Sequence, residues 1–563
     1  MIVRRPVPDL HASLAAAGVA PVLARVYAAR GIIDAAELDH SLRSLPDFGC
    51  MANIDAAAER LARAIAGREQ IVVVGDYDAD GATACAVGVR GLRAMGARVD
   101  FLVPNRFEFG YGLTPEIVAV AARGAPRLIV TVDNGIASVD GVRAAAAAGI
   151  DVLITDHHLP GDQLPAPAII VDPNQAGCAF ASKHIAGVGV MFYVLCALRA
   201  RLRERGAFAQ RPEPNLAALL DLVALGTVAD VVRLDHVNRI LVEQGLARIR
   251  AGRAQPGIAA LFAVAARDAR RATASDLGFV AGPRLNAAGR LADMSLGIRC
   301  LLAESEAEAQ PIVRELDRLN RERRDIESTM QEEALAEVET AAPGDADAYT
   351  LCVHRPEWHQ GVIGIVASRL KDRYHRPVIV FARSGERELK GSGRSIAGFH
   401  LRDALDRIAK RVPGTITRFG GHAYAAGLAI VDDALPRFAA AFEELARETL
   451  SEAELRRTHE SDGALAPGEL TLELGASLRD RVWGQGFPAP AFDDVFEVVD
   501  QRNVGEGHAK LTLKRGDERF AAIAFRTPAA LPPRIHALFR PEVNHWNGLA
   551  SLELVVDYWV PAA

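Results

Sequence analysis

Ile71-Val-Val-Val-Gly-Asp-Tyr-Asp-Ala-Asp-Gly81 is the most informative segment of this sequence. Its first four residues form a continuous run of β-branched apolar side chains, which is typical of a strand buried on both faces. A stretch with helical character follows at 82–95. Similar apolar runs recur at 128–132, 152–155 and 168–171. Strands that alternate with helices predict an α/β fold with a parallel, doubly wound sheet.

Acidic side chains follow all four of these apolar runs. In chain order they are Asp76, Asp78, Asp80, Asp133, Asp156 and Asp172, with His157 and His158 directly after Asp156. The carboxyl ends of parallel strands meet at one edge of a sheet, where ligands bind. We therefore expect these side chains to share one edge. Asp230, which follows a later apolar run, offers a further carboxylate.

A cluster of this kind needs cations. Carboxylates that lie close together repel one another, and burial adds to the cost, so they either bind protons or enclose metal ions. Oxygen-rich ligation with one or two histidines suits Mn²⁺ or Mg²⁺ better than zinc. Several carboxylates can hold two ions about 3.5–4 Å apart, the arrangement that cleaves phosphate esters. A single Asp at a strand end is more often a turn former or a helix cap, so this prediction depends on the acids occurring together.

Length and composition indicate a globular protein with several domains. The chain has 563 residues and a net charge of −6, so nucleic-acid contacts would have to come from local basic patches. No apolar run reaches the roughly 20 residues that span a bilayer, and the nearest, Ile185–Leu198, predicts a buried helix. The N-terminus lacks the layout of a signal peptide, and none of the six cysteines forms a CxxC pair. We expect a cytoplasmic protein without membrane contact.

Changes of pattern divide the chain into five predicted parts. A stretch rich in Glu, Arg, Leu and Ala predicts a long connecting helix, and alternation of apolar and polar residues at 492–525 predicts a small antiparallel β domain. The parts are an N-terminal helical extension at 1–50, an α/β domain with the acids at 51–305, the connecting helix at 306–345, a second α/β domain at 346–455 and the β domain at 456–563.

Motifs along most of the chain resemble those of the DHH phosphoesterase superfamily, and most closely its RecJ exonucleases. The name-giving Asp-His-His lies at 156–158. The other motifs include VVVGDYDADGATA (72–84), VPNRFEFGYGL (103–113), TVDNGI (131–136), GTVADVV (226–232), GPRLNAAGRL (282–291), WHQGVIGIVASRL (358–370), GSGRSIAGFHL (391–401) and FGGHAYAAGL (419–428). The resemblance implies a DHH domain with the parallel sheet, a long connecting helix, a DHH-associated α/β domain and a C-terminal OB-fold β-barrel.

The resemblance also implies two metal ions, Mn²⁺ or Mg²⁺, and their ligands. Asp133 is implied as the bridge between the two ions, and His158 as a contact of the scissile phosphate. Relatives such as the pyrophosphatases carry a metal-binding histidine at the position of Val74, where Asp76 is expected to act directly or through water. The implied metal ligands are Asp76, Asp78, Asp80, Asp133, His157 and Asp230, and the implied catalytic residues are Asp80, Asp133, His157 and His158.

A pocket for a 5′-phosphate is a further implication of the resemblance. Arginine offers a fork of donors that matches phosphate oxygens, although an ordinary salt bridge is an equal alternative for each arginine. For the histidines of the second domain, structural hydrogen bonding is an equal alternative as well. The substrate-binding residues implied are Arg106, His158, Arg284, Asn286, Ser392, Arg394 and His422.

The activity implied by the resemblance is 5′-to-3′ hydrolysis of single-stranded DNA to 5′-mononucleotides, in repair and recombination. The implied partners are single-stranded DNA with a 5′-phosphate, a single-strand-binding protein and a RecQ-type helicase, and the expected state is a monomer. One alternative is a DHH phosphodiesterase for nanoRNA or cyclic dinucleotides, which predicts a shorter chain without the β domain. The other is a catalytically silent DNA-binding relative, which predicts eroded metal ligands.

Overall fold

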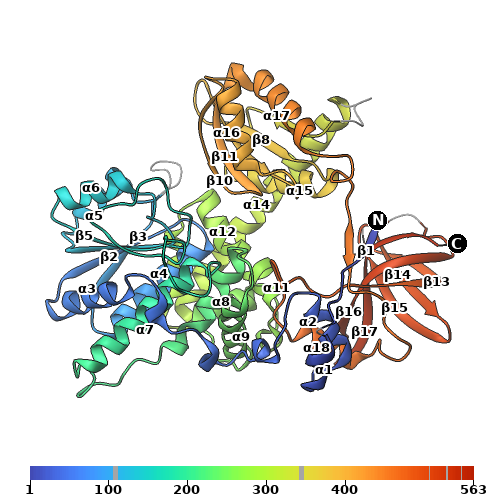
Figure 1. Ribbon diagram of the computed structural model, residues 1–563, viewed down its shortest axis with the longest axis horizontal. Helices are drawn as coiled ribbons and strands as arrows, with labels where there is room; N and C mark the ends of the chain where they lie inside the picture. Colours follow the sequence, from blue (N-terminus) through green and yellow to red (C-terminus); the bar gives the residue numbers. More distant parts are fainter. Residues whose placement is uncertain are drawn as a thin grey trace. The chain divides into compact units, whose positions relative to one another are not determined.

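The computed structural model describes residues 1–9, 11–104, 112–341, 348–505, 507–527, 530–546 and 548–562. The chain forms two compact units. The larger comprises Ile2–Asp317 with Glu460–Ala563, and the smaller comprises Arg318–His459 with Met1. Figure 1 labels their helices and strands.

A five-stranded parallel sheet in the larger unit confirms the α/β prediction (Figure 1). Its strands are, in spatial order, β3 (Arg98–Leu102), β2 (Gln70–Gly75), β4 (Leu128–Val132), β5 (Asp151–Thr155) and β6 (Ile169–Val171). Four of them are the predicted strands. The edge strand β3 was not predicted, because its exposure alternates along the strand and gives no continuous apolar run.

Helices cover both faces of this sheet, because its strands are apolar on both faces. Side chains of α5 (Pro115–Ala122) and α6 (Val139–Ala147) join strand residues in one buried cluster. The other face contacts α3 (Ile54–Ala66), α4 (Ala79–Ala94) and α7 (Gly187–Glu204). Helix α7 contains the longest apolar run of the sequence and is largely buried, as predicted. Among the described helices, none is both long and apolar enough to cross a membrane.

Strand register brings the acids to one edge of the sheet. Gly75 pairs with Val132, Val132 with Thr155, and Thr155 with Val171. Each residue of this row is the last of its strand, so the next residue in each case leaves the sheet at the same edge. The chain passes from β2 to β3 on one side and then returns to β4 on the other. Ligand crevices form at such a reversal of strand order, here between β2 and β4.

Helices and turns complete the α/β part of the larger unit. Their bounds are α8 Leu220–Ala229, α9 His236–Arg250, α10 Pro256–Val264, α11 Ala274–Asp276, α12 Gly282–Leu291 and α13 Ser295–Leu302. A single π-helical turn, η6 (Leu277–Ala281), lies between α11 and α12. The predicted connecting helix is α14 (Glu306–Ala341).

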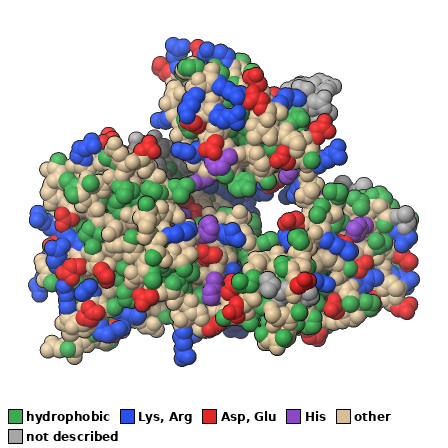
Figure 2. Space-filling view, viewed as in Figure 1, with side chains coloured by type: hydrophobic (Ala, Val, Ile, Leu, Met, Phe, Trp, Pro, Cys, Tyr) green, Lys and Arg blue, Asp and Glu red, His purple; other side chains and the backbone are tan. Residues whose placement is uncertain are grey.

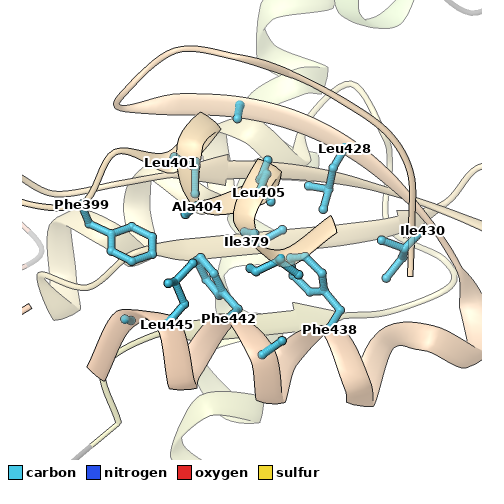
Figure 3. Close-up of a cluster of buried hydrophobic side chains, with 14 of the residues drawn as sticks. Ile379, Phe399, Leu401, Ala404, Leu405, Leu428, Ile430, Phe438, Phe442 and Leu445 are labelled. Carbon is cyan, nitrogen blue, oxygen red and sulfur yellow. The ribbon is translucent and has the colours of Figure 1, made fainter. Parts of the chain in front are cut away.

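The smaller unit is built on a mixed sheet. Its order is β10 (Ile416–Gly421), β11 (Ala425–Val431), β9 (Glu388–Arg394), β8 (Val378–Arg383) and β7 (Leu351–His354). Figure 3 shows α16 (Leu401–Arg411) and α17 (Leu435–Thr449) packed on one face, with Phe438 and Phe442 directed from α17 toward the strands. Helix α15 (Ile363–Tyr374) and part of α14 pack on the other face.

A closed barrel forms the C-terminal part, as the OB-fold expectation required. Its order is β13 (Phe492–Val504), β14 (His508–Arg515), β15 (Glu518–Ala524), β17 (Leu549–Pro561) and β16 (Arg534–Trp546). Closure leaves the sheet without free edges. A short helix, α18 (Leu472–Arg479), packs against β16.

The N-terminal segment combines helices with one strand that the sequence did not predict. Helices α1 (His11–Ala16) and α2 (Pro21–Ala28) match the expected helical extension, but β1 (Ile2–Arg4) pairs with β12 (His459–Ser461). Three residues are too short a run to give a periodic signal, so only pairing with a distant segment defines this strand.

Asp493 anchors the N-terminal segment to the barrel. Arg4 donates to both carboxylate oxygens at 2.8–3.2 Å, and Ser461 and the ring of His536 are further partners. Burial alone would raise the pKa of Asp493, but the hydrogen bonds from Arg4, Ser461 and His536 outweigh it and lower the pKa to about 2. The ionised carboxylate is therefore favoured by folding.

Acid should remove this contribution over a defined pH range. A carboxyl group whose pKa falls on folding stabilises the protein above its unfolded pKa of 3.8, and the contribution is lost as the pH falls from there to about 2. At pH 7 we expect Asp493→Asn to lower the free energy of unfolding by about 1–3 kcal/mol, which is measured as a lower urea midpoint. Near pH 2.5 the difference in unfolding free energy between this variant and wild type should be smaller. The exposed Asp500→Asn on the same strand is the control; an equal loss there would refute the assignment.

Figure 2 shows that acidic and basic side chains are interspersed over the surface in view. No single sign of charge covers that face, in keeping with the modest net charge of −6. The feature of the larger unit that stands out is instead the sheet edge where the acids emerge.

Candidate metal centre

The loop after β2 presents three aspartates at the start of α4. Asp78 is the N-cap of this helix, and its side chain accepts a hydrogen bond from the Gly81 amide at 2.9 Å. Asp80 lies in the first turn of the helix and is fully buried, and Asp76 is 6% exposed. The alternation of acids in this loop therefore serves both to start the helix and to gather carboxylates.

Asp80 is held by the first amides of α7. The amides of Gly187 and Val188 donate to its two carboxylate oxygens at 2.6 and 2.9 Å. The positive end of a helix favours a carboxylate at this position. Even so, burial and the neighbouring Asp78 raise the pKa of Asp80 to about 7. A cation beside Asp80 would relieve this penalty.

Asp133 follows β4 in a left-handed backbone conformation, with φ of 61°. Such a conformation is uncommon for a residue with a side chain and is often found at functional sites. A Cβ atom on Gly187 would lie 2.6 Å from the Cβ atom of Asp133, so only glycine allows α7 to start this close. Burial and the charges of Asp80, Asp78, Asp230 and Asp76 raise the pKa of Asp133 well above its ordinary value.

His157 lies among three of the carboxylates. Its Nε2 atom is 3.1 Å from an oxygen of Asp133, 3.5 Å from one of Asp230 and 4.0 Å from one of Asp80. Asp230 reaches this place from the C-terminal end of α8, and burial together with Asp80 and Asp78 raises its pKa well above the ordinary value. Asn174 donates to the carbonyl oxygen of His157 at 2.6 Å and so fixes the backbone there.

His158 is oriented by Asp156 rather than by the other acids. Asp156 accepts hydrogen bonds from the amides of Ile136, His157 and His158, and its Oδ1 atom lies 2.7 Å from Nδ1 of His158. Burial alone would lower the pKa of His158, but the bond to Asp156 and the negative charges nearby raise it to about 9. The ring is therefore positively charged near neutral pH. Asp156 is a positioning group.

The strand-end acids thus divide into two kinds, which the sequence pattern does not distinguish. Asp172 accepts a hydrogen bond from the Asn174 amide at 2.6 Å, and burial raises its pKa to about 8. It lies in a turn beside the cluster, as a turn-forming aspartate would. Asp133 alone among the acids after β4, β5 and β6 belongs to the groups whose ligand atoms converge.

Three sets of side chains within the described residues have ligand atoms within 4.8 Å of one another. They are Asp76, Asp78 and Asp133; Asp80, His157 and Asp230; and Asp133, His157 and His158. Buried carboxylates with raised pKa values and a neighbouring imidazole provide a donor set rich in oxygen, which fits Mn²⁺ or Mg²⁺. The residues present are therefore suited to two divalent cations.

Helix α12 supports the aspartate loop from behind. The side chain of Asn286 accepts a hydrogen bond from the Ala79 amide at 2.8 Å. A Cβ atom on Gly289 would lie 1.9 Å from the carbonyl oxygen of Tyr77, so the helix touches the loop directly. Arg284 forms a buried ion pair with Asp317 at 3.0 Å and donates to the Val280 carbonyl at 2.7 Å. Asn286 thus holds the aspartate loop, whereas Arg284 ties α12 to α14 and to the turn η6.

The smaller unit carries the remaining predicted residues. Ser392 and Arg394 lie on β9 beside the first turn of α15, where a Cβ atom on Gly364 would be 2.8 Å from Ser392 Oγ and 3.2 Å from Arg394 Nη2. Arg394 donates to Ser392 and to the Gly393 carbonyl, and burial lowers its pKa. Within the described parts of the chain, no carboxylate forms an ion pair with Arg394. His422 is exposed at the turn between β10 and β11, and Arg106 lies outside the described residues.

Sequence reasoning missed the amides of Gly187 and Val188, which bind Asp80. The signal available was the small-residue start of an apolar helix, Ala186-Gly-Val-Gly189, which reads equally well as ordinary helix packing. It also missed that Asp156 orients His158, since no sequence pattern predicts hydrogen bonds from backbone amides to an aspartate.

Comparison with protein families assigns three parts of the chain. The DHH family, N-terminal domain, matches residues 70–227, the DHHA1 domain matches 348–448 and the RecJ OB domain matches 461–558. These three ranges contain the parallel sheet, the mixed sheet and the closed barrel, in that order.

Relatives and solved structures match over nearly the whole chain. The single-stranded-DNA-specific exonuclease RecJ of Dickeya dadantii is 51% identical and that of Escherichia coli 50%, with 96% and 95% of both chains covered, respectively. A crystal structure of RecJ in complex with Mn²⁺ from Thermus thermophilus matches with a TM-score of 0.83 at 33% identity, covering 100% of this chain and 79% of that one. The same protein in complex with Mg²⁺ matches with a TM-score of 0.78 at 31% identity, covering 100% and 78%.

Proposed function

Because the chain belongs to the RecJ family of DHH phosphoesterases, we propose that it is an exonuclease specific for single-stranded DNA. It hydrolyses phosphodiester bonds from the 5′ end and releases 5′-mononucleotides, in DNA repair and recombination. The observation that carries the proposal is the convergence of Asp80, Asp133 and Asp230 on His157 Nε2 within 3.1–4.0 Å, from segments far apart in the sequence.

Two divalent cations, Mn²⁺ or Mg²⁺, complete the site. One is assigned to Asp76, Asp78 and Asp133, and the other to Asp80, His157 and Asp230 together with Asp133, which lies close to both sets. In this assignment Asp76 takes the place that the histidine fills in relatives and that Val74 leaves without a ligand atom. When bound, the cations activate water and stabilise the negative charge on the phosphoryl oxygens.

The protein's own side chains prepare the site for this chemistry. The amides of α7 hold Asp80 in place, and the left-handed backbone at Asp133 directs its carboxylate to the centre. His158, charged and oriented by Asp156, can donate a hydrogen bond to an oxygen of the scissile phosphate.

A 5′-phosphate pocket is assigned to Ser392 and Arg394 in the smaller unit. Arg394, which pairs with no carboxylate of the described residues and lies beside the N-terminal turn of α15, is suited to an anion. Arg106, Arg284, Asn286 and His422 remain proposed substrate contacts. Asn286 also holds the metal loop through the Ala79 amide, and Arg284 is paired with Asp317. The barrel at the C-terminus would bind the single strand, and its presence argues against an enzyme limited to cyclic dinucleotides.

Further parts of the proposal concern the cellular setting. We propose a monomer in the cytoplasm that works with a single-strand-binding protein and a RecQ-type helicase. The five sequence-based parts of the chain, from the extension at 1–50 to the barrel region at 456–563, are proposed as its domains.

The decisive experiment follows the products of end-labelled DNA. With Mn²⁺ or Mg²⁺ we expect the protein to shorten single-stranded DNA from its 5′ end to mononucleotides, to spare blunt duplex, and to lose activity in excess chelator. Degradation of duplex at the same rate, or full activity in the chelator, would contradict the proposal.

Arg394→Lys should reduce the preference for a 5′-phosphate. Lysine keeps the charge but loses the planar fork of donors, so we expect kcat/KM for 5′-phosphorylated DNA to fall about 10-fold or more, with a smaller change for 5′-hydroxyl DNA. Arg387→Lys, an exposed arginine of the same unit, is the control. An equal loss on both substrates would remove Arg394 from the pocket.

A further inference from the structure

Phe279 is the most exposed large hydrophobic side chain of the described residues. Its relative exposure is 76%, while its neighbours Leu277 and Ala281 are fully buried. Burying an apolar side chain of this size contributes about 1.5–3 kcal/mol. An aromatic ring left in solvent on an otherwise well-packed segment is therefore a candidate contact for a ligand.

The exposure does not come from a loose loop. Phe279 lies on the π-helical turn η6, and single π turns inside helices occur frequently at functional sites. A capping box formed by Thr273 and Asp276 precedes the turn. Arg284 donates to the carbonyl of Val280, the residue after Phe279, and is itself held by Asp317. The ring is thus presented on a fixed backbone.

The turn is attached to a segment that carries a metal ligand. A Cβ atom on Gly278 would lie 3.2 Å from a methyl of Val228, and one on Gly282 would lie 3.1 Å from the Cβ atom of Ala229. Val228 and Ala229 form the end of α8, directly before Asp230. Two glycines close to Phe279 in the sequence, Gly278 and Gly282, therefore pack against the two residues that precede Asp230.

A second exposed apolar side chain lies next to Asp230. Val231 is 62% exposed and has a left-handed backbone, with φ of 63°. The side chain of Asp230 is itself 22% exposed. Exposed apolar side chains therefore lie on both of the segments that pack together here, the turn η6 and the residues around the partly exposed Asp230.

A nucleobase is the occupant that suits Phe279. The carboxylates, with the cations they would hold, form the place where the phosphates of the strand would bind, which leaves the bases to contact the surrounding side chains. Stacking of a base on an aromatic ring contributes about 1–3 kcal/mol and tolerates every base. An exonuclease that removes nucleotides of any sequence needs such a contact, whereas hydrogen bonds to base edges would favour particular bases.

We infer that Phe279 stacks on a base of the single strand and so positions the backbone at the metal centre. This inference rests on the proposed function and deepens it. Arg284, Gly278 and Gly282 act through Phe279 and Asp230 by holding the turn between them.

The test compares Phe279→Leu with Phe279→Trp. Leucine keeps an apolar side chain but removes the stacking face, so we expect the KM for single-stranded DNA to rise about 5- to 150-fold, the equivalent of one stacked base, with little change in kcat. Tryptophan restores a stacking face, and its KM should stay within about 3-fold of wild type. Ile33→Ala, which truncates another exposed apolar side chain (62%), is the matched control.

Abasic substrates identify the contact as one with a base. We would use a series of oligonucleotides in which a single abasic position is placed at successive distances from the 5′ end. At one of these positions the missing base should lower the affinity of wild type but should not lower the affinity of Phe279→Leu any further. An equal response of wild type and Phe279→Leu at every position, or an unchanged KM in Phe279→Leu, would overturn the inference and leave a protein contact as the role of the ring. If wild type itself leaves DNA intact, the proposed function fails instead.

Discussion

Asp133→Asn is expected to lower the rate of single-stranded DNA hydrolysis about 1,000-fold or more, which corresponds to ~4 kcal/mol of activation free energy. The reason is the place of Asp133: its carboxylate lies with Asp76 and Asp78 on one side and 3.1 Å from His157 on the other. Asparagine has the same shape but lacks the charge that both cation positions need. Single-turnover hydrolysis at saturating Mn²⁺ measures the loss directly.

The same variant should be more stable than wild type when metal is absent. Folding raises the pKa of Asp133, so the ionised group destabilises the folded protein, and this penalty grows as the pH rises above the unfolded pKa of 3.8. We expect the melting temperature of metal-free Asp133→Asn to exceed that of wild type at pH 8, and the difference to shrink toward pH 4.

Metal binding should reverse this order. Mn²⁺ is expected to raise the melting temperature of wild type far more than that of Asp133→Asn, because only wild type binds the cations well. Asp140→Asn, an exposed carboxylate on α6, is the control and should behave as wild type. Full activity of Asp133→Asn, or an equal response of both proteins to Mn²⁺, would refute the metal assignment.

Arg30→Met is expected to lower the free energy of unfolding by about 3–5 kcal/mol, because it leaves a buried carboxylate without its main partner. The side chains of Arg30 and Asp462 are each 1% exposed, and the guanidinium donates to both carboxylate oxygens at 2.7 and 2.9 Å. Arg30 also lies over the ring of Trp483, with 5.4 Å to its centroid. Urea denaturation at pH 7 measures the change.

A second substitution should restore much of the lost stability. In Arg30→Met with Asp462→Asn, the buried charge is gone while the side chain still accepts the hydrogen bond from the Ala491 amide. We expect at least half of the lost stability to return. The exposed pair of Arg143 and Asp140 is the control, where Arg143→Met should change stability by less than about 1 kcal/mol. A loss of that small size in Arg30→Met would mean that the buried pair of Arg30 and Asp462 contributes little to stability.

Parts of the fold could be predicted from the sequence because they depend on patterns within short segments. The apolar runs at β2, β4, β5 and β6 predicted the strands, and parallel pairing followed from the helices between them. Composition likewise predicted the connecting helix, and alternation predicted a C-terminal β domain, whose barrel form was implied by the resemblance alone. β1 and β3 were not predicted, whereas β6, as short as β1 and also at an edge, was. The three residues of β1 and the alternating exposure of β3 give no continuous apolar run, which β6 has.

For the sheet edge, the sequence predicted the types of the residues and their positions after the strands, but not the role of each residue. Asp133, Asp156 and Asp172 look alike in the sequence, because each follows an apolar run. The structure separates them: Asp133 faces the other ligands, Asp156 binds three amides and His158, and Asp172 closes a turn with Asn174. Arg284 and Asn286, predicted from the resemblance as substrate contacts, are engaged with Asp317 and the Ala79 amide.

By itself, the sequence determined four strands of the parallel sheet, the chemical nature of the cluster and the identity of its acids, since periodicity and residue type are properties of short segments. Only the tertiary structure decided which acids converge, that the first amides of α7 hold Asp80, and that Phe279 stays in solvent on a fixed turn. These features depend on contacts between separate segments of the chain, such as Asp80 with Val188, which are 108 residues apart. The direction of a side chain is set by that packing, and no local pattern encodes it.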